Sequence, residues 1–143
     1  MDPHGRLRSL ALRPTRGNLR IVLNVTEASE LASHPLGVTQ VAFRCADVAA
    51  SVERLRTRGV SFMAVPNNYY VDLAARFRLA PEFVSELRDH QLMYDRAGGG
   101  ELLHAYTDVL GTGFYVELLE RRGGYDGYGS ANTFVRLAAQ AGS

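Results

Sequence analysis

The sequence predicts an α+β fold in which one mixed sheet carries helices on its outer face. Several short segments alternate apolar and polar residues with a period of two, which is typical of half-buried strands. Segments with apolar residues spaced three or four apart, typical of helices, are fewer. Because strands outnumber the helices that would connect them, a doubly wound parallel sheet is disfavoured.

The first expected element is a β-hairpin from Leu7 to Val25. Its second arm alternates apolar residues from Leu19 onward, and the segment Pro14–Asn18 supplies proline and glycine for a turn. The segment Thr26–Leu36 fits either a linker or a short helix. We therefore expect residues 1–36 to form a hairpin and linker, and residues 37–143 to form the main module.

The main module begins with a predicted strand over Gly37–Phe43, which is rich in β-branched and aromatic residues. Asp47 is a suitable N-cap for a helix that Gly59 ends. A second strand is predicted over Val60–Val65, before Pro66.

The rest of the module is predicted to contain a helical insertion, a three-stranded meander and a final helix. Apolar patches around Leu73 and after Pro81 indicate the two helices of the insertion. The meander and the final helix are expected over Leu92–Asp95, Leu102–Thr107, Phe114–Leu119 and Asn132–Gln140.

Composition excludes several classes of protein. Among the 143 residues, 16 basic and 15 acidic side chains give a net charge of +1, so nothing indicates a nucleic-acid partner. No apolar run approaches the roughly 20 residues that span a bilayer, and the start lacks a signal-peptide core. The single cysteine, Cys45, suits a reducing compartment. We expect a cytoplasmic protein that binds neither nucleic acid nor membrane.

Three polar residues occupy positions on otherwise apolar strands: Gln40, His104 and Glu117. A carboxylate turned into an apolar sheet must be neutralised, paired or bound to a cation. One hypothesis is that a metal ion is held by Glu117 and His104, because carboxylate and imidazole bind iron, zinc and manganese. The alternatives are that these faces meet solvent, or that Glu117 pairs with an arginine.

Two further patterns carry weaker signals. The side chains of Asn67–Tyr70, which follow Pro66, either line a pocket or begin a helix. The glycines at Gly98–Gly100 and Gly123–Gly129 lack the strand-to-helix spacing of a phosphate-binding loop, so we interpret them as turns.

Six segments of the main module carry a family resemblance: Gly37–Phe43, Val65–Tyr70, Met93–Asp95, Leu102–Thr107, Phe114–Arg121 and Gly127–Asn132. In this order they resemble the last part of 4-hydroxyphenylpyruvate dioxygenases. That family belongs to the vicinal-oxygen-chelate superfamily, whose βαβββ modules cup a metal. The segments Arg121–Gly129 and Val135–Gln140 are also similar to the dioxygenase-like C-terminal half of bacterial 3-dehydroshikimate dehydratases.

The resemblance implies roles for individual residues. Glu117 matches the carboxylate of a two-His-one-carboxylate triad that holds Fe(II) and leaves room for a 2-oxo acid and O₂. Gln40 stands where the family has a metal histidine, and His104 matches a position, usually glutamine, that faces the substrate. Tyr128 and Asn132 match the segment that closes over the pocket. The hairpin matches the closing strands of a preceding module.

Two functional hypotheses follow. The first is a dioxygenase-like oxidoreductase for a small aromatic or 2-oxo acid, with Fe(II) or another divalent metal on Glu117, His104 and Gln40. In this hypothesis the acid contacts His104, Gln40, Asn67, Tyr128 and Asn132. The second is a non-catalytic binding or assembly module, which the glutamine at position 40 favours. Both expect a homodimer or pairing with a dioxygenase-like or dehydratase partner, because half a cup leaves a sheet edge exposed.

Overall fold

A computed structural model describes the backbone of residues 8–25, 37–111 and 113–141. The segment Thr26–Leu36, for which we expected a linker or a short helix, lies outside the described residues. The chain divides into two compact units, residues 1–37 and 38–143, and each is described by itself.

The first unit contains the predicted hairpin. Strands β1 (Arg8–Leu12) and β2 (Ile21–Val25) pair antiparallel, with Leu10 opposite Leu23. Gly17, in the connecting turn, has a φ of +89°, a conformation that glycine adopts without strain. The prediction of a hairpin is thus confirmed.

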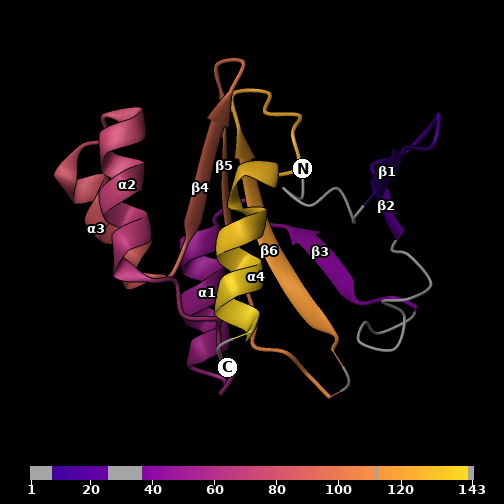
Figure 1. The fold of residues 1–143 in the computed structure, drawn as a ribbon, viewed down its shortest axis with the longest axis horizontal. Coiled ribbons are helices and arrows are strands. Elements are labelled where there is room, and N and C mark those ends of the chain that lie inside the picture. Colours follow the sequence, from indigo (N-terminus) through magenta and orange to yellow (C-terminus); the bar gives the residue numbers. More distant parts are fainter. Residues whose placement is uncertain (1–7, 26–36, 112, 142–143) are drawn as a thin grey trace. The chain divides into compact units, whose positions relative to one another are not determined.

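The second unit is built on one mixed four-stranded sheet (Figure 1). The strand order is β3-β6-β5-β4, in which β3 and β6 are parallel and the other neighbours are antiparallel. The strands are β3 (Gln40–Arg44), β4 (Met93–Ala97), β5 (Gly100–Tyr106) and β6 (Tyr115–Arg122). The helices are α1 (Val48–Arg56), α2 (Asn67–Phe77), α3 (Pro81–Asp89), the short 3₁₀ helix η2 (Ser130–Asn132) and α4 (Thr133–Ala141). This α+β arrangement agrees with the predicted class.

Helix α1 forms where the sequence predicts it. The Asp47 carboxylate accepts a hydrogen bond from Ala50 N at 2.8 Å, which satisfies one of the free amides of the first turn. A second acceptor comes from the sheet, because Glu120 Oε2 lies 3.0 Å from Val48 N. Val48 and Val52 are fully buried against the sheet. The start of α1 is therefore fixed by two acceptors, and its apolar face is fixed by packing against the sheet.

The predicted strand over Val60–Val65 is wrong. Only Phe62 forms a bridge, to Thr107, and Met63 N donates to Tyr106 O at 2.9 Å. The segment thus follows the end of β5 without extending the sheet. Near its end, Val65 N donates to the Gln91 side chain at 2.6 Å and not to a strand. The strand predicted over Gly37–Phe43 is present but begins later, at Gln40.

Helices lie on both faces of the sheet. Side chains alternate along β6, so Glu120, which meets α1, and Glu117 point to opposite faces. On the Glu117 face, Arg136 of α4 lies over the rings of Tyr106 and Tyr115. Figure 1 shows α4 and α1 on opposite sides of the strands. The sequence pattern led us to expect helices on one outer face only. In the structure they lie on both faces.

The helical insertion packs at the β4 edge of the sheet (Figure 1). Tyr69 and Tyr70 of α2 are buried, and their rings meet edge to face at 5.3 Å. Phe77 and Phe83 make similar edge contacts with the ring of Tyr94 in β4. Aromatic packing of this kind stabilises beyond the area that it buries, so it fixes the insertion to the sheet. Within the described residues, no helix is long and apolar enough to cross a membrane.

Candidate functional site

The centre of the candidate site is the carboxylate of Glu117, near the middle of β6. Its residue is only 7% exposed, between the buried neighbours Tyr115 and Leu119 on the same face. The carboxylate is therefore turned into the protein, as expected from its apolar strand, and an unpaired charge there would be strongly destabilising.

Two side chains satisfy this carboxylate. His104 Nδ1 lies 2.8 Å from Glu117 Oε1, and Gln40 Nε2 donates to Glu117 Oε2 at 2.5 Å. Strand pairing brings Gln40, His104 and Glu117 together, because β3 and β5 both flank β6 and the three side chains lie on one face of the sheet. Each carboxylate oxygen thus has a donor from a neighbouring strand.

A first chain of hydrogen bonds reaches Glu117 through Gln40. Arg136 Nη1 donates to the Tyr115 hydroxyl at 2.8 Å, and that hydroxyl donates to Gln40 Oε1 at 3.1 Å. The Gln40 amide then donates to the carboxylate, so its orientation is fixed at both ends. Every donor in this chain points toward Glu117, and such aligned bonds polarise one another favourably.

A second chain reaches Glu117 through His104, which is fully buried. Asn132 Nδ2 lies 2.8 Å from His104 Nε2, and Tyr69 donates its hydroxyl hydrogen toward Asn132 Oδ1 at 3.0 Å. Because Asn132 Nδ2 only donates, His104 Nε2 must accept, and the ring hydrogen lies on Nδ1, facing Glu117. The network thus assigns the neutral Nδ1–H tautomer to His104.

The tyrosines around the carboxylate are held neutral. Burial raises the pKa of Tyr106 well above its ordinary value, and the Glu117 charge raises it further. Burial also raises the pKa of Tyr115, although Arg136 opposes that shift. Both phenols are therefore protonated near neutral pH. The Tyr106 hydroxyl lies 3.1 Å from His104 Nδ1, beside the bond to Glu117.

The structure brings together four of the residues singled out from the sequence: Gln40, His104, Glu117 and Asn132. It does not bring the other two into this cluster. Asn67 is exposed at the first turn of α2, and Tyr128 is 40% exposed in the loop before η2. The sequence left two interpretations of Asn67–Tyr70 open, a pocket lining and a helix start. In the structure this segment begins helix α2.

Sequence reasoning missed four contributors: Tyr69, Tyr106, Tyr115 and Arg136. A signal existed for two of them, because Tyr106 and Tyr115 share strand faces with His104 and Glu117 in the period-two pattern. Tyr69 lies in the segment Asn67–Tyr70, which the sequence analysis singles out, but nothing local indicates that it contacts Asn132. Arg136 belongs to a helix that approaches the sheet from a distant part of the chain, and no local pattern indicates that approach.

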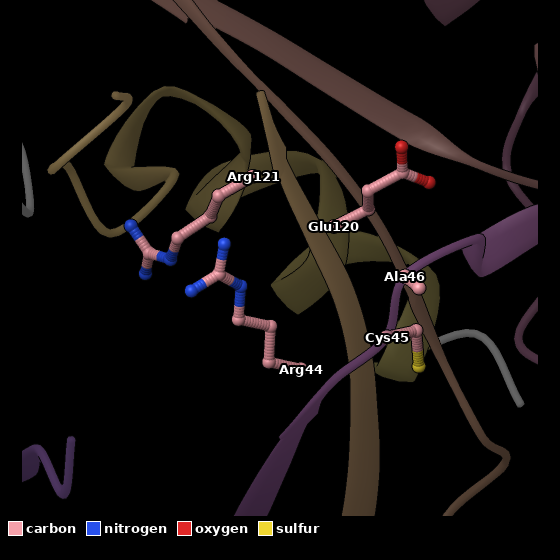
Figure 2. A pocket seen from close by; sticks show the side chains of 5 residues that line it. All are labelled: Arg44, Cys45, Ala46, Glu120 and Arg121. Atoms are coloured by element: carbon pink, nitrogen blue, oxygen red, sulfur yellow. The ribbon is translucent and has the colours of Figure 1, made fainter. Parts of the chain in front are cut away.

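A separate open depression, with a volume of about 370 Å³, lies at the far end of β3 and β6 (Figure 2). The guanidinium groups of Arg44 and Arg121 point toward one another, whereas Glu120 extends to the other side of its strand. Arg121 Nη1 also donates to the Gly127 carbonyl at 2.5 Å. The depression is lined by none of the predicted site residues; its lining is Arg44, Cys45, Ala46, Glu120 and Arg121.

Comparisons with known proteins agree with this fold. The chain is 46% identical, over 98% of its length, to 3-dehydroshikimate dehydratases of Pseudomonas putida and Pseudomonas aeruginosa, and spans 23% of each. It is 31% identical to the 4-hydroxyphenylpyruvate dioxygenase of Pseudomonas aeruginosa, over 92% of this chain and 40% of that enzyme. No family model matches the chain.

Solved structures give the same result. A xylose isomerase-like TIM barrel/4-hydroxyphenylpyruvate dioxygenase fusion protein matches with a TM-score of 0.86 and 44% identity, over 94% of this chain and 23% of that one. A mutant 4-hydroxymandelate synthase from Streptomyces coelicolor matches with a TM-score of 0.77 and 26% identity, over 94% of this chain and 42% of that one.

Fold and similarity together define a vicinal-oxygen-chelate domain of the 4-hydroxyphenylpyruvate dioxygenase type. More particularly, the chain is homologous to the dioxygenase-like C-terminal domain of 3-dehydroshikimate dehydratases.

The family resemblance implies Fe(II), so the donor set must be compared with that ion. A two-His-one-carboxylate triad needs two imidazoles, whereas Gln40, His104 and Glu117 provide one imidazole, one carboxylate and one neutral amide. The amide nitrogen of Gln40, not its oxygen, faces the carboxylate. Among the described residues, no three His, Cys, Asp or Glu side chains are grouped to hold a metal. This donor set does not fit the iron triad.

Proposed function

We propose that this chain is a non-catalytic binding and assembly module, related to the dioxygenase-like part of a 3-dehydroshikimate dehydratase. One observation carries the proposal: both oxygens of Glu117 accept hydrogen bonds from Gln40 and His104. The carboxylate that the resemblance assigns to a metal is therefore satisfied by the protein itself.

The two chains of hydrogen bonds also support a structural role for the cluster. They begin on helices at Tyr69 and Arg136 and end on the central strand at Glu117. A fully satisfied buried network of this kind holds its elements in one arrangement, and breaking one member leaves others unpaired. The network therefore joins α2 and α4 to the sheet.

The ligand class that we propose is a small aromatic or 2-oxo acid. The support comes from Arg136, whose guanidinium carbon lies 5.6 Å from the Tyr106 ring centre and 5.4 Å from that of Tyr115. A cation held beside aromatic rings suits a ligand that combines a carboxylate with a flat apolar body. Addition of 4-hydroxyphenylpyruvate should shift amide resonances of α4 and β6, and the shifts should be lost in Arg136→Met.

The assembly role is supported by strand β3, at one edge of the sheet. Val38, just before it, is 75% exposed, and Phe43 within it is 55% exposed. An edge strand with exposed apolar side chains is a template for pairing with another chain. We propose that this edge pairs with a second copy of the chain, giving a homodimer.

Oxygen uptake with 4-hydroxyphenylpyruvate, with and without added Fe(II), tests the non-catalytic assignment. We expect no iron-dependent uptake, whereas the related Pseudomonas aeruginosa dioxygenase, as positive control, consumes oxygen under the same conditions. Uptake by this chain that requires Fe(II) and is lost in Glu117→Gln would overturn the proposal.

The second candidate is a metal-dependent dioxygenase-like enzyme for the same class of acid. The observation that favours it is that Glu117 and His104 are adjacent and buried. They lie on the face to which the family resemblance assigns the metal. The oxygen-uptake experiment separates the two candidates, because only the enzyme would consume oxygen.

A further inference from the structure

A groove between α2 and α3 contains two buried polar atoms, the Tyr70 hydroxyl and Arg88 Nε. Neither atom has a hydrogen-bond partner among the described residues. Buried polar groups in folded proteins are nearly always paired, so each exception needs an explanation. An unpaired buried donor destabilises the folded state.

The two atoms belong to side chains that touch. The Tyr70 residue is fully buried, and the Arg88 guanidinium carbon lies 5.5 Å from the centre of its ring. Arg88 Nε can only donate, and the Tyr70 hydroxyl has its hydrogen free to donate. Two neighbouring side chains therefore each offer a donor, and neither donor has an acceptor.

The electrostatic environment favours an anion. The charged side chains that act on the Tyr70 hydroxyl are Arg56 and Arg88, both cations. Arg56 is held nearby by a hydrogen bond from its Nη1 to the Asp89 carbonyl at 3.1 Å. An acceptor with negative charge, such as a carboxylate, would meet positive charge as well as two donors.

The walls of the groove are apolar. Its volume is about 350 Å³, within the range of small-molecule sites. Val71, at its rim, is 59% exposed, so the groove opens to solvent. The remaining lining comes from one face of each helix and the link between them: Ala74, Leu79, Pro81 and Val84.

We propose that this groove binds a small apolar carboxylic acid, whose carboxylate accepts hydrogen bonds from Tyr70 and Arg88 while its apolar body lies along the α2 and α3 walls. The long Arg88 side chain covers the Tyr70 ring and moves aside to admit the carboxylate. The site is distinct from the Glu117 cluster, and the inference does not depend on the proposed function.

Sodium benzoate is a suitable probe, with acetate and benzamide as matched controls that lack the apolar body or the charge. In a two-dimensional amide NMR titration of the full chain, benzoate should shift resonances of α2 and α3. Acetate and benzamide should bind at least several-fold more weakly. Absence of benzoate shifts, or shifts confined to α4 and β6, would overturn the inference; the second result would instead support the proposed acid site there.

Two variants identify the donors. Tyr70→Phe should weaken benzoate binding about tenfold, the loss expected for one hydrogen bond to a charged group. Arg88→Met should abolish it, whereas Arg54→Met on the exposed face of α1 should leave it unchanged. Unaltered affinity in Tyr70→Phe and Arg88→Met would refute the assignment.

A stability measurement separates a ligand site from a permanently bound water. Without benzoate, Tyr70→Phe should be as stable as the original chain or more so, because it removes an unpaired hydroxyl. A loss of stability in that variant, together with a crystal structure showing only an ordered water on the Tyr70 hydroxyl after a benzoate soak, would contradict the proposal.

Discussion

At the scale of single residues, hydrogen bonds offset the cost of burying the Glu117 carboxylate. Glu117 accepts from His104 and Gln40, and both donors are oriented by further partners. The sequence indicates that Glu117 needs a partner, because its strand is otherwise apolar. It does not indicate which partner, since the choice between a metal, an arginine and a histidine depends on how three strands align.

Asn132 should be the most sensitive polar residue in the loop that precedes α4. Its amide serves His104 Nε2 and the Tyr94 carbonyl, and its oxygen accepts from Tyr69. Asn132→Ala leaves these buried groups unpaired and should lower the free energy of unfolding by about 2 kcal/mol. Urea denaturation measures this, with Asn68→Ala on the exposed side of α2 as control. Equal stability of the two variants would show that the network contributes little.

Buried tyrosines make the protein sensitive to alkali. Burial raises the pKa of both Tyr94 and Tyr125 from 10.0 to about 12. Above the ordinary value of 10.0 the unfolded chain loses these protons while the folded chain keeps them. The free energy of unfolding should therefore fall as the pH rises through this window, and these two groups should have no effect below it.

The measurement for this prediction is urea denaturation at a series of alkaline pH values. Tyr94→Phe should flatten the alkaline loss of stability, because the variant has one less proton to lose on unfolding. A loss as steep as that of the original chain would mean that Tyr94 ionises equally in both states.

At the scale of elements, local signals in the sequence identify helix α1 and the meander, because caps, turns and periodicity act over a few residues. Asp47 and Pro81 begin helices as predicted. The segment Val60–Val65 has strand composition but forms only one bridge, since β propensity describes a side chain's fit to a sheet and not the presence of a pairing partner. The placement of α4 over Glu117 is a tertiary contact with no local signal.

Removal of the α1 cap should have a measurable cost. Asp47→Ala leaves Ala50 N without its acceptor and should destabilise the protein by about 1 kcal/mol. Asp47→Asn keeps an oxygen acceptor at the same place and should retain most of the stability. Thermal denaturation of the two variants measures the difference. An equal loss of stability in both would mean that the negative charge of Asp47, and not its hydrogen bond to Ala50 N, stabilises the helix.

At the scale of the whole module, the four-stranded sheet leaves β3 as an edge. An edge strand with exposed apolar side chains can act as a template for another chain, and we propose that a second copy covers this one. The sequence predicts an unpaired edge but not which chain covers it.

Light scattering during size-exclusion chromatography tests this pairing. The original chain should elute as a dimer, and Phe43→Lys should convert it to a monomer, because a charge then faces the shared edge. Phe134→Lys, on α4, replaces a residue that is 45% exposed and should leave the dimer intact. A monomeric original chain, or a dimer broken only by Phe134→Lys, would contradict pairing through β3.

The central claim is that the buried carboxylate of Glu117 is satisfied by hydrogen bonds from Gln40 and His104 and therefore does not bind a metal ion. Anaerobic titration calorimetry with Fe(II) tests it most directly, using the original chain, Glu117→Gln and Gln40→His, with Thr39→His as the control for an added imidazole. We expect no specific binding to the original chain and measurable binding to Gln40→His alone, which adds a second imidazole beside Glu117 and His104. Stoichiometric Fe(II) binding by the original chain that disappears in Glu117→Gln would contradict it.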